Sequence, residues 1–447
     1  MASLTTSIAL GSREAKNRLY RAPVLEVAPQ GPDAARILAR ELGPSAAAGC
    51  GLVFQGACLV TPQGGRSAPG LLRVHDPAFV RSLAPAIEEV KRHGALLLMQ
   101  LGFAGLQSME LWHREYRATH AGIETLAVSE PPWWFKAVGA TPILDLSTVR
   151  VLREEEMTTL AEAFGRSAGY AAEAGYDGVH LAGANGSIFQ QCWSPVFNRR
   201  KDGFGGSTLR ERSRFFHLVV ESIRRHAPRG FLLTTKIPAE TQAPLFVRGA
   251  LTMEDGVEIA RIAQDAGVDA IVPVRVGVTR DQATARGRFP DLAWHDARWQ
   301  AGYHRAFGGR ARTALVREAN RVAARVMPFE PRWNEGFCRA VKRAVDVPVL
   351  CEGGIRSRSD TARVLDGAAD MVGMARPFYA EPRLAWRLLH ETDARALCES
   401  CNNCTIPQVT GATGVCRTPE ILAARGRMQR AGAYGATDDG QHPGREG

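Results

Sequence analysis

The sequence predicts an α/β protein built as a single (β/α)8 barrel, with long loops after two strands and a short cysteine-rich C-terminal extension. Eight short runs rich in leucine and β-branched residues alternate with amphipathic helical stretches over most of the 447 residues. Two helical stretches end in Ala-Gly shortly before an Asp-led strand, where glycine supplies the left-handed cap that turns a helix back into a buried strand. The hydrophobic fraction of 45% and the charged fraction of 23% are ordinary for a globular protein.

The expected strands are mostly followed by expected helices, which is the order of a parallel barrel. The strands are expected at Arg18–Val24, Gly51–Gln55, Ala95–Leu101, Asp177–Gly183, Phe231–Ile237, Asp269–Val274, Pro348–Glu352 and Asp370–Met374. The helices are expected at Pro77–His93, Glu154–Ala174, Leu209–His226, Thr252–Ala266, Pro331–Val345 and Ser359–Asp366. Such a barrel carries its active site on the loops that follow the strands.

Two of those loops, residues 102–150 and 275–327, are long enough to form lids or binding walls. The first contains Pro131-Pro132-Trp133-Trp134-Phe135, which we expect to cap a flat or apolar substrate. The domain boundaries follow from composition: a barrel over residues 1–392, a cysteine-rich segment over 393–418 and a tail over 419–447. The tail is rich in Gly, Arg and Ala, and this composition predicts disorder.

The net charge is +10 and the basic residues are nearly all arginine. Because they are scattered along the chain, a nucleic-acid partner is not expected. No apolar stretch approaches the roughly 20 residues that a membrane helix needs, and the N-terminal residues lack the pattern of a signal peptide. We therefore expect a cytoplasmic protein that acts without a membrane, and the sequence leaves a homo-oligomer open.

Glycines and polar side chains lie at the ends of several of the expected strands. The seventh strand ends in Glu352-Gly353-Gly354 and the eighth in Gly373-Met374-Ala375-Arg376. Glycine lets a backbone approach a ligand closely, so these consecutive turns predict a phosphate site to which Arg376 adds charge. Gln100 lies at the end of the third strand, where an amide can pair with an imide-like ring edge. Lys236 lies at the end of the fifth, where a cation can stabilise a reduced, anionic ring. A structural role is the alternative for both, and His180 in the fourth strand is expected to be a hydrogen-bonded barrel histidine.

Four of the nine cysteines lie within 19 residues near the C-terminus. In a reducing compartment such clustering favours a metal site over disulfides. Three thiolates at x2 spacing with one remote cysteine are typical of an iron–sulfur site, and four thiolates also suit zinc. The candidate ligands of a [4Fe–4S] cluster or zinc are Cys398, Cys401, Cys404 and Cys416. A metal-free remnant is the third alternative.

Residues 177–207 carry the densest set of motifs in the chain. They read DGVHLAGANG over 177–186, followed by Gln191, Ser194-Pro195 and NRRKDGFGGS over 198–207. With Lys16-Asn17-Arg18, Ala22-Pro23, Gln100-Leu101 and both glycine turns, this set resembles the Old Yellow Enzyme family, near its 2,4-dienoyl-CoA reductase branch. The resemblance runs from about residue 10 to residue 418. It implies an FMN-binding barrel that transfers a hydride to or from an organic substrate, by C=C reduction or the reverse dehydrogenation, with NADH or NADPH as the reductant.

The resemblance also implies roles for the residues that match the family pattern. Backbone neighbours and partners of the flavin ring would be Pro23, Val24, Gly56, Gln100 and Lys236, and the phosphate would be held by Gly354, Gly373, Ala375 and Arg376. The family often has Arg at the position of Lys236, and the required positive charge is retained here.

The substrate side departs from the family pattern. Many members have a His-x-x-His or His-x-x-Asn pair followed by a proton-donating Tyr, where this chain has Ala182, Asn185 and Ser187. We take Asn185 and Ser187 as catalytic candidates and add His295, because residues 294–298 (WHDAR) resemble a stretch that supplies a catalytic His in the dienoyl-CoA reductases. A solvated loop histidine is the alternative for His295. The altered residues also favour a second function, an FMN-binding electron carrier or scaffold without ene-reductase activity.

In the dienoyl-CoA reductase branch a similar four-cysteine run binds a [4Fe–4S] cluster, with one more residue between the second and third cysteines. Members with this cluster usually continue into FAD- and NAD(P)-binding domains. No strand-led GxGxxG motif follows the cysteines here, so a cluster is expected to exchange electrons with a separate protein. Zinc would instead anchor the tail to the barrel and have no redox role.

Overall fold

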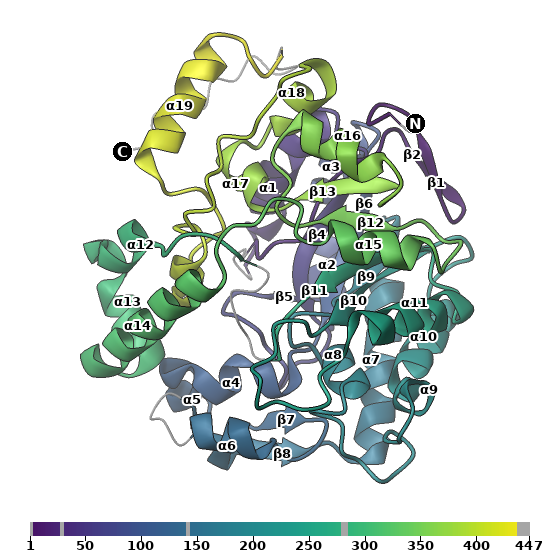
Figure 1. Ribbon diagram of the computed structural model, residues 1–447, viewed down its shortest axis with the longest axis vertical. Helices are drawn as coiled ribbons and strands as arrows, with labels where there is room; N and C mark the ends of the chain where they lie inside the picture. Colours follow the sequence, from purple (N-terminus) through teal and green to yellow (C-terminus); the bar gives the residue numbers. More distant parts are fainter. Residues whose placement is uncertain (1–2, 27–30, 140–143, 279–284, 436–447) are drawn as a thin grey trace.

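The computed structural model confirms the predicted barrel, with strands in the middle and helices around them (Figure 1). The strands run parallel in the order β11-β10-β9-β6-β4-β3-β13-β12. β11 and β12 close the barrel through a parallel bridge between Ile271 and Val349 and a 3.0 Å hydrogen bond from the Ile271 N–H to the Pro348 carbonyl. The residues that the structure describes are 3–26, 31–139, 144–278 and 285–435.

All eight barrel strands coincide with predicted ones. They are β3 (Leu19–Arg21), β4 (Leu52–Leu59), β6 (Leu96–Gly102), β9 (Gly178–Leu181), β10 (Leu232–Ala239), β11 (Ala270–Arg275), β12 (Leu350–Glu352) and β13 (Met371–Met374). Every residue of β9, β10 and β13 is buried, because one face of each strand fills the barrel and the other meets the helices. Smaller pieces are β1 (Ile8–Leu10), β2 (Arg13–Ala15), β5 (Leu72–Arg73), β7 (Thr125–Ala127) and β8 (Val149–Val151).

The six predicted helices are present, and two of them are divided. The first forms α2 (Pro77–Ser82) and α3 (Ala84–Lys91), because Pro85 has no N–H for the helical bond to the carbonyl four residues earlier. The third forms α9 (Leu209–Arg212) and α10 (Arg214–His226). The others are α7 (Glu154–Glu173), α11 (Met253–Asp265), α15 (Glu335–Lys342) and α16 (Arg358–Leu365), and the prediction omitted α1 (Ala34–Ala47), α17 (Arg376–Ala380) and α18 (Leu384–His390).

The described parts of the long segments after β6 and β11 contain helices. The first holds α4 (Met109–Trp112), α5 (Arg114–Thr119) and α6 (Trp133–Gly139). The second holds α12 (Asp291–His295), α13 (Ala297–Phe307) and α14 (Arg310–Val326), which project from the barrel at the left of Figure 1. Trp294, Tyr303 and Phe307 form a small core of their own there, which holds α12 and α13 together.

The prediction of disorder is wrong for the first part of the tail. Residues 419–430 form α19, with Pro419 in its first turn. Ile421 packs with Ala380 and Cys398, and the Tyr434 hydroxyl donates to the buried Glu381 carboxylate at 2.9 Å. The contacts of Ile421 and Tyr434 thus hold this segment in place, although its composition is polar on average. Residues 436–447 lie outside the described residues.

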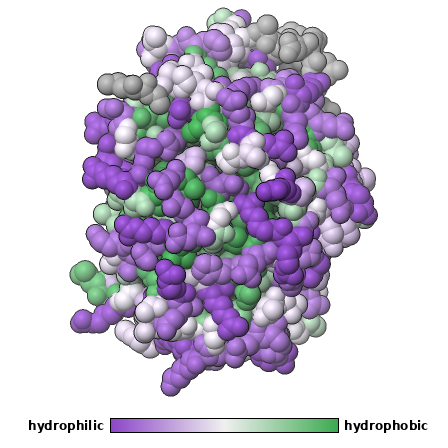
Figure 2. Space-filling model, turned by 90° about the vertical axis from the view of Figure 1, so that its right-hand side faces the viewer, coloured by the Kyte–Doolittle hydropathy of each residue, from purple (hydrophilic) through white to green (hydrophobic). Residues whose placement is uncertain are grey.

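Polar side chains dominate the face of the molecule in Figure 2, and apolar ones show between them in small patches. Large apolar side chains that are exposed include Trp133, Leu245 and Phe246. Within the described ranges, no helix has both the length and the apolar character needed to cross a membrane.

Candidate active site

The carboxyl ends of the barrel strands surround a cavity of about 280 Å³, which we call the strand-end cavity. Six of the predicted site residues line it: Pro23, Val24, Gln100, Asn185, Ser187 and Lys236. Leu25, Leu71, Phe103 and Val276 make much of the remaining wall apolar. Among the described residues that line this cavity there is no His, Tyr, Asp or Glu.

Lys236, at the end of β10, gives the strand-end cavity a positive charge. Its ammonium group forms an ion pair with one carboxylate oxygen of Glu352 at the end of β12, and 6% and 13% of the two side chains are exposed. The second oxygen, Oε2 of Glu352, is buried and has no hydrogen-bond partner among the described residues. Such an unsatisfied buried carboxylate oxygen is costly, although Glu352 itself does not line the cavity.

Gln100 and His180 lie side by side on β6 and β9 and have different surroundings. The Gln100 amide lines the cavity and makes no hydrogen bond to another described side chain or backbone group. His180 is buried, and its Nδ1 lies 2.8 Å from the Thr234 hydroxyl. Burial, with help from the charge of Lys236, holds the pKa of His180 well below its ordinary value, so the ring is neutral. His180 is therefore the hydrogen-bonded barrel histidine that the sequence predicts.

Asn185 and Ser187 lie on the loop after β9 and face the cavity. Asn185 has a φ of 64°, a left-handed conformation that asparagine tolerates better than most residues. Ser187 is the N-cap of α8 (Ile188–Trp193), yet its side chain makes no capping bond. The Ser187 hydroxyl is buried without a hydrogen-bond partner among the described residues. It is therefore available to a molecule bound in the cavity.

Glu240 and Gln190, which the sequence analysis missed, hold this loop in place. The Gln190 amide accepts a hydrogen bond from the Gly186 N–H at 2.8 Å and donates to the Gly277 carbonyl and to Glu240, both at 2.9 Å. Glu240 also accepts from the Ser194 hydroxyl at 2.8 Å. Burial raises the pKa of Glu240 to about 7. Three strand-end loops are thus joined around one buried carboxyl group.

Gly56 does not line the strand-end cavity, although its neighbour Ala57 does. Its N–H donates to the Glu26 carboxylate at 2.6 Å, and that carboxylate forms a buried 2.7 Å ion pair with Arg21. A Cβ at position 56 would lie 1.3 Å from the Val24 carbonyl oxygen. Glycine is needed here because the ends of β3 and β4 approach so closely.

The two glycine turns predicted for phosphate lie outside the strand-end cavity. Gly353 and Gly354 have φ values of 106° and 73°, which favour glycine. The segment at Glu330 covers them: a Cβ on Gly354 would lie 2.3 Å from the Glu330 carbonyl oxygen. Gly373 lies against the Tyr20 ring, 2.1 Å from where a Cβ would stand.

Arg376 and Ala375 do not line the strand-end cavity either. Arg376 donates to the carbonyls of Ala285 and Arg286, at 3.4 and 2.9 Å, and to the Asn402 side chain. The guanidinium group thus joins the turn after β13 to the loop before α12 and to the cysteine-rich segment. A phosphate role for these turns stays a prediction.

The four C-terminal cysteines are free thiols on one loop. Cys398 and Cys404 are buried, and Cys401 Sγ lies 3.0 Å from the Thr418 hydroxyl. Burial raises the pKa of the Cys404 thiol to about 12; the charge of Arg376 opposes this shift and the other three cysteines add to it. Within the part of the chain that the structure describes, no three Cys, His, Asp or Glu side chains are arranged to hold a metal ion.

His295 and the Trp133–Phe135 group are not brought to the strand-end cavity. His295 lies on α12 with 52% of its side chain exposed, and its Nδ1 is 2.9 Å from the Asp291 carbonyl oxygen. Trp134 and Phe135 are buried against Phe197, and Trp133 is exposed. The structure thus corrects the expectation that this aromatic group caps the cavity, because its apolar faces are used to fold the segment after β6.

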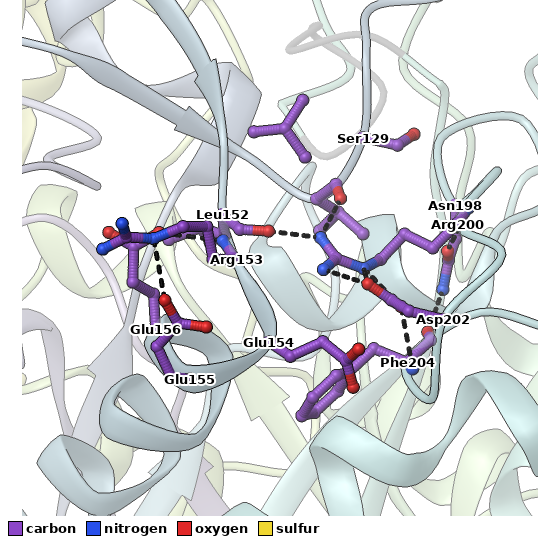
Figure 3. Close-up of polar contacts among 12 residues, drawn as sticks. Ser129, Leu152, Arg153, Glu154, Glu155, Glu156, Asn198, Arg200, Asp202 and Phe204 are labelled. Carbon is purple, nitrogen blue, oxygen red and sulfur yellow. Dashed lines mark hydrogen bonds and ion pairs between the residues drawn. The ribbon is translucent and has the colours of Figure 1, made fainter.

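The motif residues Arg200 and Asp202 have a structural role (Figure 3). Arg200 forms a two-pronged ion pair with Asp202 and donates to the carbonyls of Val128 and Leu152 at 2.7 and 2.6 Å. The Asp202 carboxylate also accepts from the Phe204 N–H at 3.1 Å. This part of the motif joins the segment after β9 to the β7–β8 segment and does not reach the cavity.

Known proteins resemble this chain in sequence and in fold. The NADH:flavin oxidoreductase / NADH oxidase family matches residues 3–271. An NADH oxidase of Thermoanaerobacter brockii is 25% identical over 384 residues, which are 82% of this chain and 50% of that protein. A 4,4'-dithiodibutanoate disulfide reductase of Rhodococcus erythropolis is 25% identical over 426 residues, which are 94% of this chain and 96% of that protein. A solved 2-naphthoyl-CoA reductase with bound 2-naphthoyl-CoA has a TM-score of 0.72 at 18% identity, covering 94% of this chain and 57% of that one, and shows the same fold.

The chain spans about half the length of the first of these relatives. The family match covers more than half of the chain, from the residues before β3 into β11. It includes Gln100, Asn185, Ser187 and Lys236, which the fold brings together in one cavity. The chain therefore belongs to the NADH:flavin oxidoreductase / NADH oxidase family.

Proposed function

We propose that the chain is an FMN-dependent oxidoreductase that exchanges a hydride with a flat or apolar organic substrate. The observation that carries this proposal is the convergence of Gln100, Lys236, Asn185 and Ser187 from three strand ends on one cavity with apolar walls. The proposed reaction is C=C reduction or the reverse dehydrogenation, with NADH or NADPH as reductant, and the family description favours NADH.

The residues of the strand-end cavity fit FMN. FMN, when bound, supplies a ring that accepts and gives up a hydride. The Gln100 amide, which has no partner among the described residues, would bind the imide-like edge of that ring. Lys236 would hold a fixed positive charge beside it. We propose that the turns at Gly354, Gly373, Ala375 and Arg376 would hold the phosphate. Pro23 and Val24 would be backbone neighbours of the ring, and Gly56 would lie beside it.

Asn185 and Ser187 would act on the substrate. The Asn185 amide would donate to a substrate carbonyl and so polarise it. The Ser187 hydroxyl, buried without a partner and not used as a helix cap, would hold or pass a proton at the substrate. His295 has no contact with this cavity and has no role in the proposal.

An FMN-binding electron carrier is the second candidate. The observation that favours it is the absence of His, Tyr, Asp and Glu from the described lining of the strand-end cavity, because alkene reduction needs a proton donor. In a carrier, the flavin would exchange electrons with a separate protein and not with a substrate in the cavity.

Absorption spectra and turnover of the purified protein test both candidates. We expect flavin bands and NADH oxidation that 2-cyclohexenone stimulates. Asn185→Gly keeps the left-handed backbone and removes the amide, so it should lower kcat/KM about tenfold without changing the flavin content. Ser187→Ala should mainly lower kcat. Flavin that is reduced only by a partner protein would support the carrier, and protein without flavin would refute both.

We further propose that Cys398, Cys401, Cys404 and Cys416 bind a [4Fe–4S] cluster, with zinc as the alternative. The support is the donor set itself, four free thiols within residues 398–416 at a spacing typical of an iron–sulfur site. Nine free cysteines also fit the reducing cytoplasm that we propose as the location. A cluster would exchange electrons with a separate protein.

Metal analysis of anaerobically purified protein separates these alternatives. We expect about four iron atoms per chain and a broad absorption that acid bleaches. Cys404→Ser should remove both, and Cys338→Ser, which changes a buried thiol outside the cysteine-rich segment, should remove neither. One zinc per chain and no iron would contradict the cluster.

A further inference from the structure

A second cavity, of about 400 Å³, lies between α7 and the loop after β4. We call it the α7 cavity. Its volume is within the range of about 300–1,000 Å³ that is usual for small-molecule sites. Leu152, Leu160, Ala163 and Phe103 make much of its wall apolar, and all four are buried. The sequence analysis gave this part of the molecule no role beyond packing.

Phe103 separates the α7 cavity from the strand-end cavity. It is the one residue, among those described, that lines both. Its ring is closely packed on the strand-end side, since a Cβ on Gly65 would lie 2.3 Å from it. A molecule in the α7 cavity would therefore touch a side chain that also forms a wall of the proposed substrate site.

Ser167, on α7, gives the α7 cavity a buried hydroxyl group. The residue is 0% exposed and lines the cavity, and its hydroxyl has no hydrogen-bond partner in the described ranges. A serine inside a helix usually bonds the carbonyl four residues earlier, and Ser167 does not do so. A buried hydroxyl without a partner costs free energy unless a ligand or water satisfies it.

Arg166 places a cation at the edge of the same cavity. It is exposed, and no described carboxylate forms an ion pair with it. Glu162, one turn earlier on α7, pairs with Arg225 instead. The acidic group on this wall, Glu156, is already neutralised: it accepts from Arg150 and from the Arg153 N–H, both at 2.8 Å (Figure 3 shows Glu156 beside Arg153).

We propose that the α7 cavity binds a small amphipathic carboxylate. The apolar part of the ligand lies against Leu160, Ala163 and Phe103, and its carboxylate pairs with Arg166. The Ser167 hydroxyl donates to an oxygen of the ligand or of a water that enters with it. The combination of an apolar wall, an unpaired cation and an unsatisfied hydroxyl selects this class over neutral apolar molecules and over polar anions.

Calorimetric titration of the 447-residue chain with octanoate, and with 1-octanol as the uncharged match, tests this proposal. We expect octanoate to bind more tightly than octanol. Arg166→Gln should weaken octanoate binding about fivefold and leave octanol unchanged. Arg261→Gln, which changes an exposed arginine on α11, is the matched control and should change neither.

Filling each cavity in turn locates the bound molecule. Ala163→Phe should abolish binding of both compounds, and Leu160→Trp serves the same purpose if Ala163→Phe does not fold. Ala182→Phe, which fills the strand-end cavity, should leave octanoate binding intact. Binding that is lost in Ala182→Phe and kept in Ala163→Phe would overturn the proposal, and so would octanoate that does not bind at millimolar concentration.

Discussion

Replacing Lys236 with methionine is expected to destabilise the protein by about 3–5 kcal/mol and to weaken flavin binding at least tenfold. The loss of stability follows because the variant leaves the Glu352 carboxylate buried and unpaired. The loss of binding follows from the removal of a charged hydrogen-bond donor, worth about 1.5–3 kcal/mol. Urea denaturation measures the first effect and titration of flavin fluorescence measures the second.

A double variant separates the two effects of Lys236. Lys236→Met with Glu352→Gln removes both charges, so most of the stability should return while flavin binding stays weak. Lys236→Arg keeps the charge and should retain both properties. A double variant that binds FMN as tightly as the wild type would show that Lys236 has only a structural role.

Glu240→Ala is expected to cost about 3–5 kcal/mol of unfolding free energy. It removes the acceptor of three buried N–H or O–H groups: one N–H of the Gln190 amide, the Ser194 hydroxyl and the Leu251 N–H, which lies 2.9 Å from the carboxylate. Urea denaturation at pH 7 measures the cost. A value below 1 kcal/mol would mean that the loops after β9, β10 and β11 do not depend on this group.

The ionisation of Glu240 also predicts how stability depends on pH. Burial raises its pKa from 4.5 to about 7, so the folded protein holds a proton that the unfolded chain has lost within this window. The resulting stability is fully present below pH 4.5 and is lost as the pH rises through about 7, a change on the order of 3 kcal/mol. Glu240→Gln should lack this fall, and Glu254→Gln, an exposed change on α11, should keep it. Parallel curves for wild type and Glu240→Gln would contradict the prediction.

The barrel could be predicted from the sequence because each strand is buried on both faces and reads as a short apolar run. The errors lie where tertiary contacts decide the outcome. The fifth strand continues to Ala239, beyond its predicted end at Ile237, because Pro238 stays paired in register with Val274 of β11. The helix α19 forms because Ile421 and Tyr434 find partners on the barrel, which composition does not reveal.

The candidate site was predicted in part, for a similar reason. Gln100 and Lys236 could be found because polar side chains at the ends of barrel strands are rarely accidental. The same rule, applied four residues beyond Lys236, would have indicated Glu240. The pairing of Lys236 with Glu352 joins positions far apart in the sequence, and the contact of Arg376 with Asn402 depends on how the cysteine-rich segment folds back. Neither contact leaves a local signal.

The closure between β11 and β12 has a consequence for the motions of the native state. These two strands are joined by a single residue pair, Ile271 with Val349. Every other pair of neighbouring barrel strands shares at least two paired residues. Local opening of a barrel begins where the fewest bonds must break, so we expect backbone amides along this seam to exchange with solvent earlier than those of the other barrel strands. Lys236 on β10 and Glu352 on β12 form a buried ion pair across the same seam. The ion pair therefore helps to hold this seam closed. We expect a ligand that strengthens the ion pair to slow local opening of the barrel.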